Sequence, residues 1–125
     1  MVRRARAEDG AEVWPLVRDF ALSYEPEKRV FERSFTDLLS RPDTLVAVAD
    51  EDGSIIGYLL ASWHVTFFAN GPVAWVEELM VSQPARGSGV GRALVAGRAL
   101  GPVGPLRLHR HCEQARRRLL RGARL

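Results

Sequence analysis

The residues between Arg86 and Arg92 could bind a phosphate group. They form the run Arg86-Gly87-Ser88-Gly89-Val90-Gly91-Arg92, which follows an apolar segment and precedes residues at helical spacing. The first N–H groups of a helix have no intrahelical partner and carry partial positive charge, so they bind anions. Glycine tolerates positive φ and lets an anion approach the amides, while arginine adds charged hydrogen bonds. A glycine needed only for close helix packing is the alternative interpretation.

Two adjacent carboxylates, Glu77 and Glu78, lie in the segment before this loop. Residues 73–81 are apolar and rich in β-branched and aromatic types, which predicts a buried strand. Successive side chains of a strand point to opposite faces, so we expect one carboxylate to enter a cleft and the other to face solvent or a partner. A carboxylate in a cleft can take a proton from an ammonium group before the amine attacks. Solvated acids, or acids paired with arginines, are the alternative.

The run Arg86-x-x-Gly89-x-Gly91, five residues after Val81, resembles the acetyl-CoA signature of the GNAT superfamily of N-acetyltransferases. Rival phosphate-binding motifs do not fit, because the chain has no Gly-Lys-Ser/Thr and lacks the G-x-G-x-x-G spacing of dinucleotide sites. The resemblance implies the α/β (α+β) acyl-CoA N-acyltransferase fold. That fold has a mixed, mainly antiparallel sheet with helices on both faces.

The same resemblance implies an activity and a set of site residues. The activity is direct transfer of an acetyl group from acetyl-CoA to a primary amine of a small molecule or a protein. Main-chain groups of the apolar triplet would pair with the pantetheine arm, and the glycine-loop amides with Arg92 would hold the pyrophosphate. These cofactor-binding residues are Leu79, Met80, Val81, Arg86, Gly87, Ser88, Gly89, Val90, Gly91 and Arg92. As in polyamine acetyltransferases, Glu77 would be the base, with Glu78 as the second candidate.

A weaker similarity to the polyamine-type members concerns the amine pocket. Tyr24 and Glu25, together with Trp63 and Phe68, stand where such enzymes bind the substrate amine. Acidic and aromatic side chains suit a cation. Tyr24, Trp63 and Phe68 could equally belong to the core.

The predicted elements follow the order β-α-α-β-β-β-α. Acidic residues precede an apolar helical pattern over 10–23, and a second helix is predicted over 27–39, before Pro42. Asp50 to Gly53 predicts a hairpin turn. The predicted strands are 2–5, 45–49, 55–65 and 73–81, with a loop over 67–72 and a last helix from Val90.

Length and composition indicate one domain, residues 1–125, of which 1–101 resemble the family and 102–125 form an atypical basic tail. The chain is 46% hydrophobic and has one cysteine, Cys112, so no intramolecular disulfide is possible. No apolar run reaches about 18 residues, so we expect a cytoplasmic protein without membrane contact. Residues 1–97 hold ten Lys and Arg against fourteen Asp and Glu, whereas 98–125 hold eight Arg and one acid. No aromatics interleave these arginines, so nucleic acid is not an expected partner.

The tail departs from the family pattern. The expected tyrosine motif, whose hydroxyl usually protonates the leaving thiolate, is absent after Tyr58. A frameshift after about Leu100 is one explanation, because 118–125 can be written in codons that encode that motif in another frame. His109, His111 and Cys112 lack further ligands at metal-site spacing, so no metal is predicted. The alternative function is a non-catalytic CoA-binding or partner-binding remnant, which could form a homodimer through an exposed sheet edge.

Overall fold

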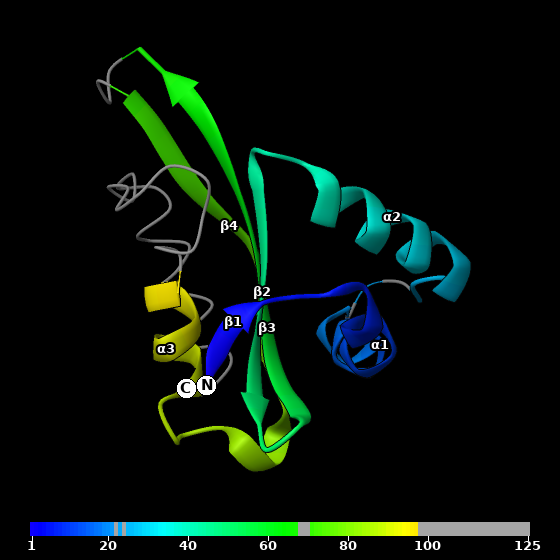
Figure 1. The fold of residues 1–125 in the computed structure, drawn as a ribbon. Helices are drawn as coiled ribbons and strands as arrows, with labels where there is room; N and C mark the ends of the chain where they lie inside the picture. The colour runs from blue at the N-terminus through cyan, green and yellow to red at the C-terminus, as the bar shows by residue number, and fades with distance from the viewer. Residues whose placement is uncertain (22, 24, 68–70, 98–125) are drawn as a thin grey trace.

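The computed structural model describes residues 1–97 except 22, 24 and 68–70 (Figure 1). The basic tail, 102–125, with His109, His111 and Cys112, where no metal is predicted, therefore lies outside the described residues. The described elements follow one another as two helices between the first and second strands, then three consecutive strands, then a helix. This is the predicted order.

A four-stranded antiparallel sheet in the order β1-β2-β3-β4 forms the centre of the molecule. Each strand is hydrogen-bonded to the next along the chain, and β3 and β4 continue beyond β2 as a two-stranded arm (Figure 1). The loop predicted over 67–72 is too long at its end, because Gly71 and Pro72 belong to β4 and pair with Thr66 and Val65. The strands are β1 (Val2–Arg4), β2 (Thr44–Glu51), β3 (Ser54–Thr66) and β4 (Gly71–Val81).

The β2–β3 turn has the geometry that its sequence predicts. Asp52 has φ 53° and Gly53 has φ 88°, while Glu51 and Ser54 form the last cross-strand pair. Two successive positive φ angles are the signature of a type I′ turn, whose twist matches that of the flanking strands. The Asp50 carboxylate accepts a hydrogen bond from the Gly53 N–H at 2.8 Å, which holds the turn closed.

Helices cover both faces of the sheet, as predicted. One face carries α1 (Gly10–Phe20), which follows the short 3₁₀ turn η1 (Ala7–Asp9), and α2 (Lys28–Ser40). The other face carries α3 (Val90–Ala96), which follows η2 (Gln83–Ala85). Figure 1 shows the sheet edge-on, with α1 and α2 on one side of it and α3 on the other.

Helix α1 differs from its prediction at its end and contains a proline. It ends at Phe20 rather than at residue 23, because Ala21 is already extended with ψ 108°. Pro15 is the sixth residue of the helix, beyond the first turn, where proline is normally tolerated. It has no N–H to give to the Ala11 carbonyl, but Ala11 is exposed, so solvent can satisfy that carbonyl.

Two apolar clusters hold the helices on the sheet. Inward residues of α3 join one face of β2, β3 and β4, and inward residues of α1 and α2 join the other. Val30 of α2, which the helical pattern places in the core, is 46% exposed. The buried helix residues are Leu94 and Val95 on the first face, and Val13, Leu16 and Phe35 on the second.

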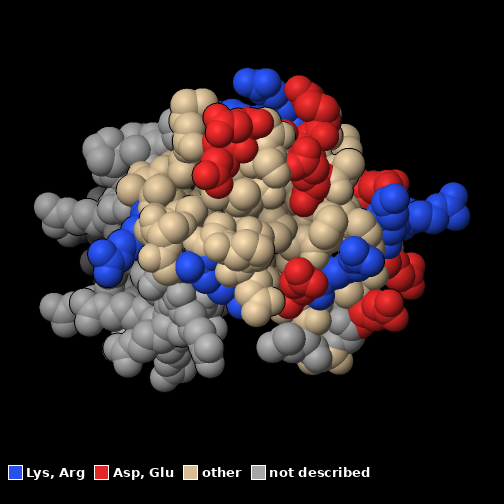
Figure 2. Space-filling view, turned by 90° about the horizontal axis from the view of Figure 1, so that it is seen from below, with Lys and Arg blue, Asp and Glu red and all other residues tan. Residues whose placement is uncertain are grey.

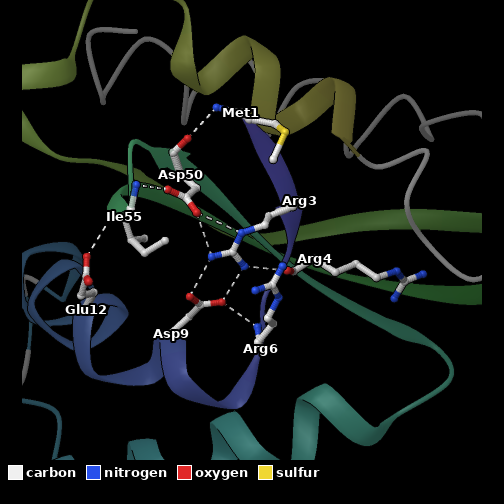
Figure 3. A network of polar contacts seen from close by, with 9 residues as sticks. Met1, Arg3, Arg4, Arg6, Asp9, Glu12, Asp50 and Ile55 are labelled. Atoms are coloured by element: carbon white, nitrogen blue, oxygen red, sulfur yellow. Dashed lines mark hydrogen bonds and ion pairs between the residues drawn. The ribbon is translucent and has the colours of Figure 1, made fainter.

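The guanidinium of Arg3 joins three parts of the chain (Figure 3). Its two terminal nitrogens donate to the two oxygens of Asp9 at 2.8 and 2.9 Å, and Nε donates to Asp50 at 3.2 Å. Asp9 also accepts the Arg6 N–H at 2.7 Å. The network therefore connects β1, the start of α1 and the β2–β3 hairpin.

Both carboxylates of this network are held in their charged form. The Arg3 hydrogen bonds lower the pKa of Asp9 below its ordinary 3.8, and the Gly53 N–H, followed by Arg3, lowers the pKa of Asp50. A folded-state pKa below the unfolded value means that Asp9 stabilises the fold above about pH 4. That stabilisation is lost as pH falls through the lower pKa of the folded state.

We predict that Asp9→Asn lowers the free energy of unfolding by about 1–3 kcal/mol at pH 7, since it breaks a largely buried charged pair. The deficit should shrink as the pH falls below 4. Urea denaturation at pH 7 and pH 3 measures both effects. The matched control is Asp37→Asn, which breaks the exposed Asp37–Arg41 pair and should cost less than about 0.5 kcal/mol. Equal costs for the two variants would contradict the role given to Arg3.

Candidate functional site

Strand β4 contains one residue more than β3 opposite its centre. Leu60 pairs with Glu78, whereas the next residue, Ala61, pairs with Val76, so Glu77 has no partner. Such a β-bulge shifts the alternation of side chains by one residue. Val76 and Leu79, three positions apart, consequently both lie in the cluster on the α3 face.

The bulge turns both candidate carboxylates to the face that carries α1 and α2. The Ser62 hydroxyl donates to Glu77 Oε1 at 3.0 Å, and the Tyr58 hydroxyl donates to Glu78 Oε1 at 2.7 Å. Ser62 and Tyr58 are an even number of residues apart on β3 and therefore share one face. The prediction that the two acids would point to opposite faces is wrong, because it assumed an unbroken strand.

The two carboxylates differ in environment. Glu77 is exposed, whereas Glu78 is half-buried next to Tyr58, which is only 3% exposed. Burial raises the pKa of Tyr58 far above its ordinary value, and the charge of Glu78 raises it further. Tyr58 therefore stays a hydrogen-bond donor at every ordinary pH and fixes the position of Glu78. Glu77 accepts the hydroxyl of the half-buried Ser62 and is itself open to solvent.

We predict that Tyr58→Phe lowers the free energy of unfolding by about 1–2 kcal/mol. The variant removes a hydrogen bond to a charged group but keeps the shape of the ring. Ser62→Ala is the matched control, since it removes the corresponding hydroxyl from the exposed Glu77 and should cost less than about 0.5 kcal/mol. Thermal unfolding of the two variants beside the parent measures the difference. A Tyr58→Phe variant as stable as Ser62→Ala would mean that the buried hydrogen bond does not hold Glu78.

The far edge of β4 is not covered by any strand among the described residues. β4 pairs with β3 on one side through Leu79, Met80 and Val81, the predicted cofactor-binding triplet. One carbonyl of the triplet already has a partner, since Arg86 Nε donates to the Val81 oxygen at 3.1 Å. No local pattern in the sequence predicts this contact. Arg86 thus ties the end of β4 to the loop that follows it.

Two glycines give the loop after β4 its shape. Gly87 has φ 86° and Gly89 has φ 89°, as predicted, and a Cβ built on either would meet open space. Gly91 differs from the prediction, because it lies inside α3, where it is buried and has no positive φ. These glycines therefore serve different purposes: the first two bend the backbone and the third lies in the first turn of the helix.

The loop presents free backbone donors. The Arg86 N–H donates to the Gln83 carbonyl, and the Ala93 N–H donates to the Gly89 carbonyl to begin α3. Among the described backbone contacts, no amide from residue 87 to 92 donates to a carbonyl. Arg92 is exposed on the first turn of the helix. The loop therefore offers N–H groups and one cation to an anion.

Gly57 of β3 lets α3 approach the sheet. A Cβ at this position would lie 3.0 Å from Leu94 Cδ1 and 3.0 Å from the Met80 carbonyl oxygen. Both distances are shorter than ordinary van der Waals contact, so any side chain would push α3 away. This position connects the packing of the sheet with the placement of the glycine loop.

Of the predicted amine-pocket residues, the structure places Trp63 away from the carboxylates. Trp63 is 5% exposed in the cluster on the α3 face, opposite Glu77 and Glu78, and within the described residues its indole N–H has no hydrogen-bond partner. Glu25 is exposed. Tyr24 and Phe68 lie outside the described residues.

Charge is mixed on the end of the molecule that carries the β2–β3 turn and η2. Figure 2 views this end, where Lys and Arg side chains are separated from one another by Asp, Glu and neutral surface. Over residues 1–97 as described, no three His, Cys, Asp or Glu side chains are grouped to hold a metal ion. None of the helices in that part of the chain has the length and apolar character needed to cross a bilayer.

Comparison with known proteins identifies the family. The chain matches the model of the Acetyltransferase (GNAT) family over residues 11–97, which contain both carboxylates and the glycine loop. The chain belongs to this family. A search among curated proteins finds no matching relative.

Solved structures share the fold at low sequence identity. The chain is 22% identical to a transcriptional regulator from Bacillus halodurans C-125, over 97% of this chain and 89% of that one, with a TM-score of 0.72. It is 18% identical to an aminoglycoside 6'-N-acetyltransferase from Acinetobacter haemolyticus, over 95% and 88%, with a TM-score of 0.70. It is 20% identical to a ribosomal-protein-alanine N-acetyltransferase from Brucella melitensis, over 98% and 89%, with a TM-score of 0.65. At these identities the likeness shows the fold alone.

Proposed function

We propose that this protein transfers an acetyl group from acetyl-CoA directly to a primary amine. The observation that carries the proposal is that β4 connects carboxylates, which can take a proton from the amine, with backbone amides, which can bind the diphosphate of CoA. Its bulge presents two carboxylates on one face, and its end leads into a loop of free amides. Family membership supports the reaction type, and the aminoglycoside and ribosomal-protein relatives, by their names, act on amines.

The residues at the loop fit the diphosphate of a CoA molecule. Free N–H groups from Gly87 to Arg92 are donors without partners among the described contacts, and open space lies above Gly87 and Gly89. Amides at the start of a helix bind phosphate oxygens well. The uncovered edge of β4 is where the pantetheine arm would pair with the main chain of Leu79, since the register directs the N–H and C=O of Met80 toward β3.

Glu77 is our candidate for the base. An amine arrives as ammonium at neutral pH and must lose a proton before its nitrogen can attack the thioester carbonyl carbon. The exposed Glu77 can take that proton, while Glu78, fixed by Tyr58, orients the ammonium. The N–C bond then forms, the C–S bond breaks and the thiolate leaves. Edge amides of β4 can stabilise the oxyanion of the tetrahedral intermediate.

The first test is calorimetric titration of the 125-residue chain with acetyl-CoA. We predict micromolar binding that Gly87→Glu and Gly89→Glu abolish, because each adds a carboxylate where the diphosphate would lie. Gly53→Glu is the matched control, since Gly53 has the same φ and open space but lies in the β2–β3 turn. It should bind as the parent does. Absence of binding by a folded parent chain would refute the proposed function.

The second test measures release of CoA thiol with a panel of primary amines. We predict that Glu77→Gln lowers kcat about 10²- to 10⁴-fold without changing acetyl-CoA affinity, the usual range for loss of a general base. Glu51→Gln, an exposed acid of the β2–β3 hairpin, should leave kcat unchanged. Binding without turnover in the parent would favour the non-catalytic CoA-binding alternative. Full activity of Glu77→Gln would remove Glu77 as the base.

A further inference from the structure

A small apolar pocket lies beside Glu78, between α1, α2 and the sheet. Its volume is about 90 Å³. Its floor includes Val13, Val46 and Tyr58, which are all buried. The half-buried Leu60 and Glu78 and the exposed Ser34 stand at its rim. The pocket opens on the same face as the two carboxylates.

One charged side chain, Glu78, lines this otherwise largely apolar pocket. Among the residues that the structure describes, Glu78 is the only carboxylate that lines it, and no Lys, Arg or His does so. One oxygen of Glu78 accepts the Tyr58 hydroxyl, so the carboxylate is fixed at the rim. A single fixed negative charge beside an apolar cavity is complementary to a molecule with one cationic end and an apolar arm.

The volume limits the length of that arm. A water molecule takes up roughly 30 Å³ in the liquid, and a cavity of about 150 Å³ binds benzene. A pocket of about 90 Å³ therefore has room for three or four aliphatic carbons but not for an aromatic ring. An arm that ended in a second ammonium would bury a charge against Val13 and Val46, which offer it no partner.

We propose that the acceptor is a primary monoamine with a short aliphatic arm, whose ammonium lies at Glu78 while its arm fills this pocket. As a statement about the substrate, this inference rests on the acetyl transfer proposed above. As a statement about binding, it can be tested without acetyl-CoA. It separates this protein from polyamine acetyltransferases, which the acidic pair alone would suggest.

The direct test uses NMR titrations of the 125-residue chain with ethylamine, propylamine, butylamine and 1,4-diaminobutane, with and without acetyl-CoA. We expect affinity to rise about fourfold for each added methylene up to butylamine, the gain for burying one such group. The diamine should bind at least tenfold more weakly than butylamine. Affinity that does not depend on arm length, or a diamine that binds as well as butylamine, would overturn the proposal.

A variant at the rim locates the binding. Ser34→Trp places a large ring over the pocket from an exposed position and should weaken butylamine at least tenfold. Thr36→Trp, also exposed on α2 but outside this pocket, is the matched control and should bind butylamine as the parent does. Both variants should keep the thermal unfolding midpoint of the parent, which verifies their folding. Unchanged butylamine binding in Ser34→Trp would overturn the assignment to this pocket.

The two proposals fail in different ways. A chain that shows the arm-length dependence but does not bind acetyl-CoA would refute the acetyltransferase function and leave the amine pocket in place. A chain that acetylates ethylamine, butylamine and 1,4-diaminobutane with equal kcat/KM would support the function and overturn the pocket.

Discussion

One extra residue in β4 determines that both carboxylates, Glu77 and Glu78, lie on the sheet face that carries α1 and α2. A regular strand would turn Glu77 and Glu78 to opposite sides of the sheet, and one carboxylate would be directed toward the apolar surface under α3. The bulge at Glu77 instead sets both on the side of α1 and α2, next to hydroxyls supplied by β3. Beyond the bulge, Leu79 and Val81 return to the α3 face, so the core stays continuous. A local irregularity of the backbone thus separates polar from apolar positions.

The same strand connects the acidic pair with the glycine loop. A strand rises about 3.3 Å per residue, so the three residues from Glu78 to Val81 span about 10 Å. The position of the loop beyond Val81 depends on α3, which lies close to the sheet because Gly57 has no side chain. Arg86 adds a second restraint through its bond to the Val81 carbonyl. Strand pairing, helix packing and one side chain therefore fix the spacing of the two groups.

Local sequence signals predicted the fold well and the site only in part. The pair Asp52-Gly53 predicted the β2–β3 turn, because these residue types adopt positive φ readily. Gly87 and Gly89 predicted the bend of the loop after β4 for the same reason. The bulge was missed, although Val76-Glu77-Glu78-Leu79 carries a sign of it: two polar residues between two core residues break a period of two. Arg3 could not be paired from sequence, since its partners lie 6 and 47 positions away and only the folded chain brings them together.

The short strand β1 has a consequence for the order in which this chain folds. Strands β2, β3 and β4 are joined by successive hairpins, whose contacts are local and form quickly. β1 reaches β2 only after a loop containing both α1 and α2 has closed, at the larger entropic cost of a long loop. Until then, the edge of β2 is unpaired, and residues 44–49 of that strand form the longest buried run among the described residues. A free apolar edge is a template for pairing between chains, so the docking of the three residues of β1 protects this edge of the nascent sheet.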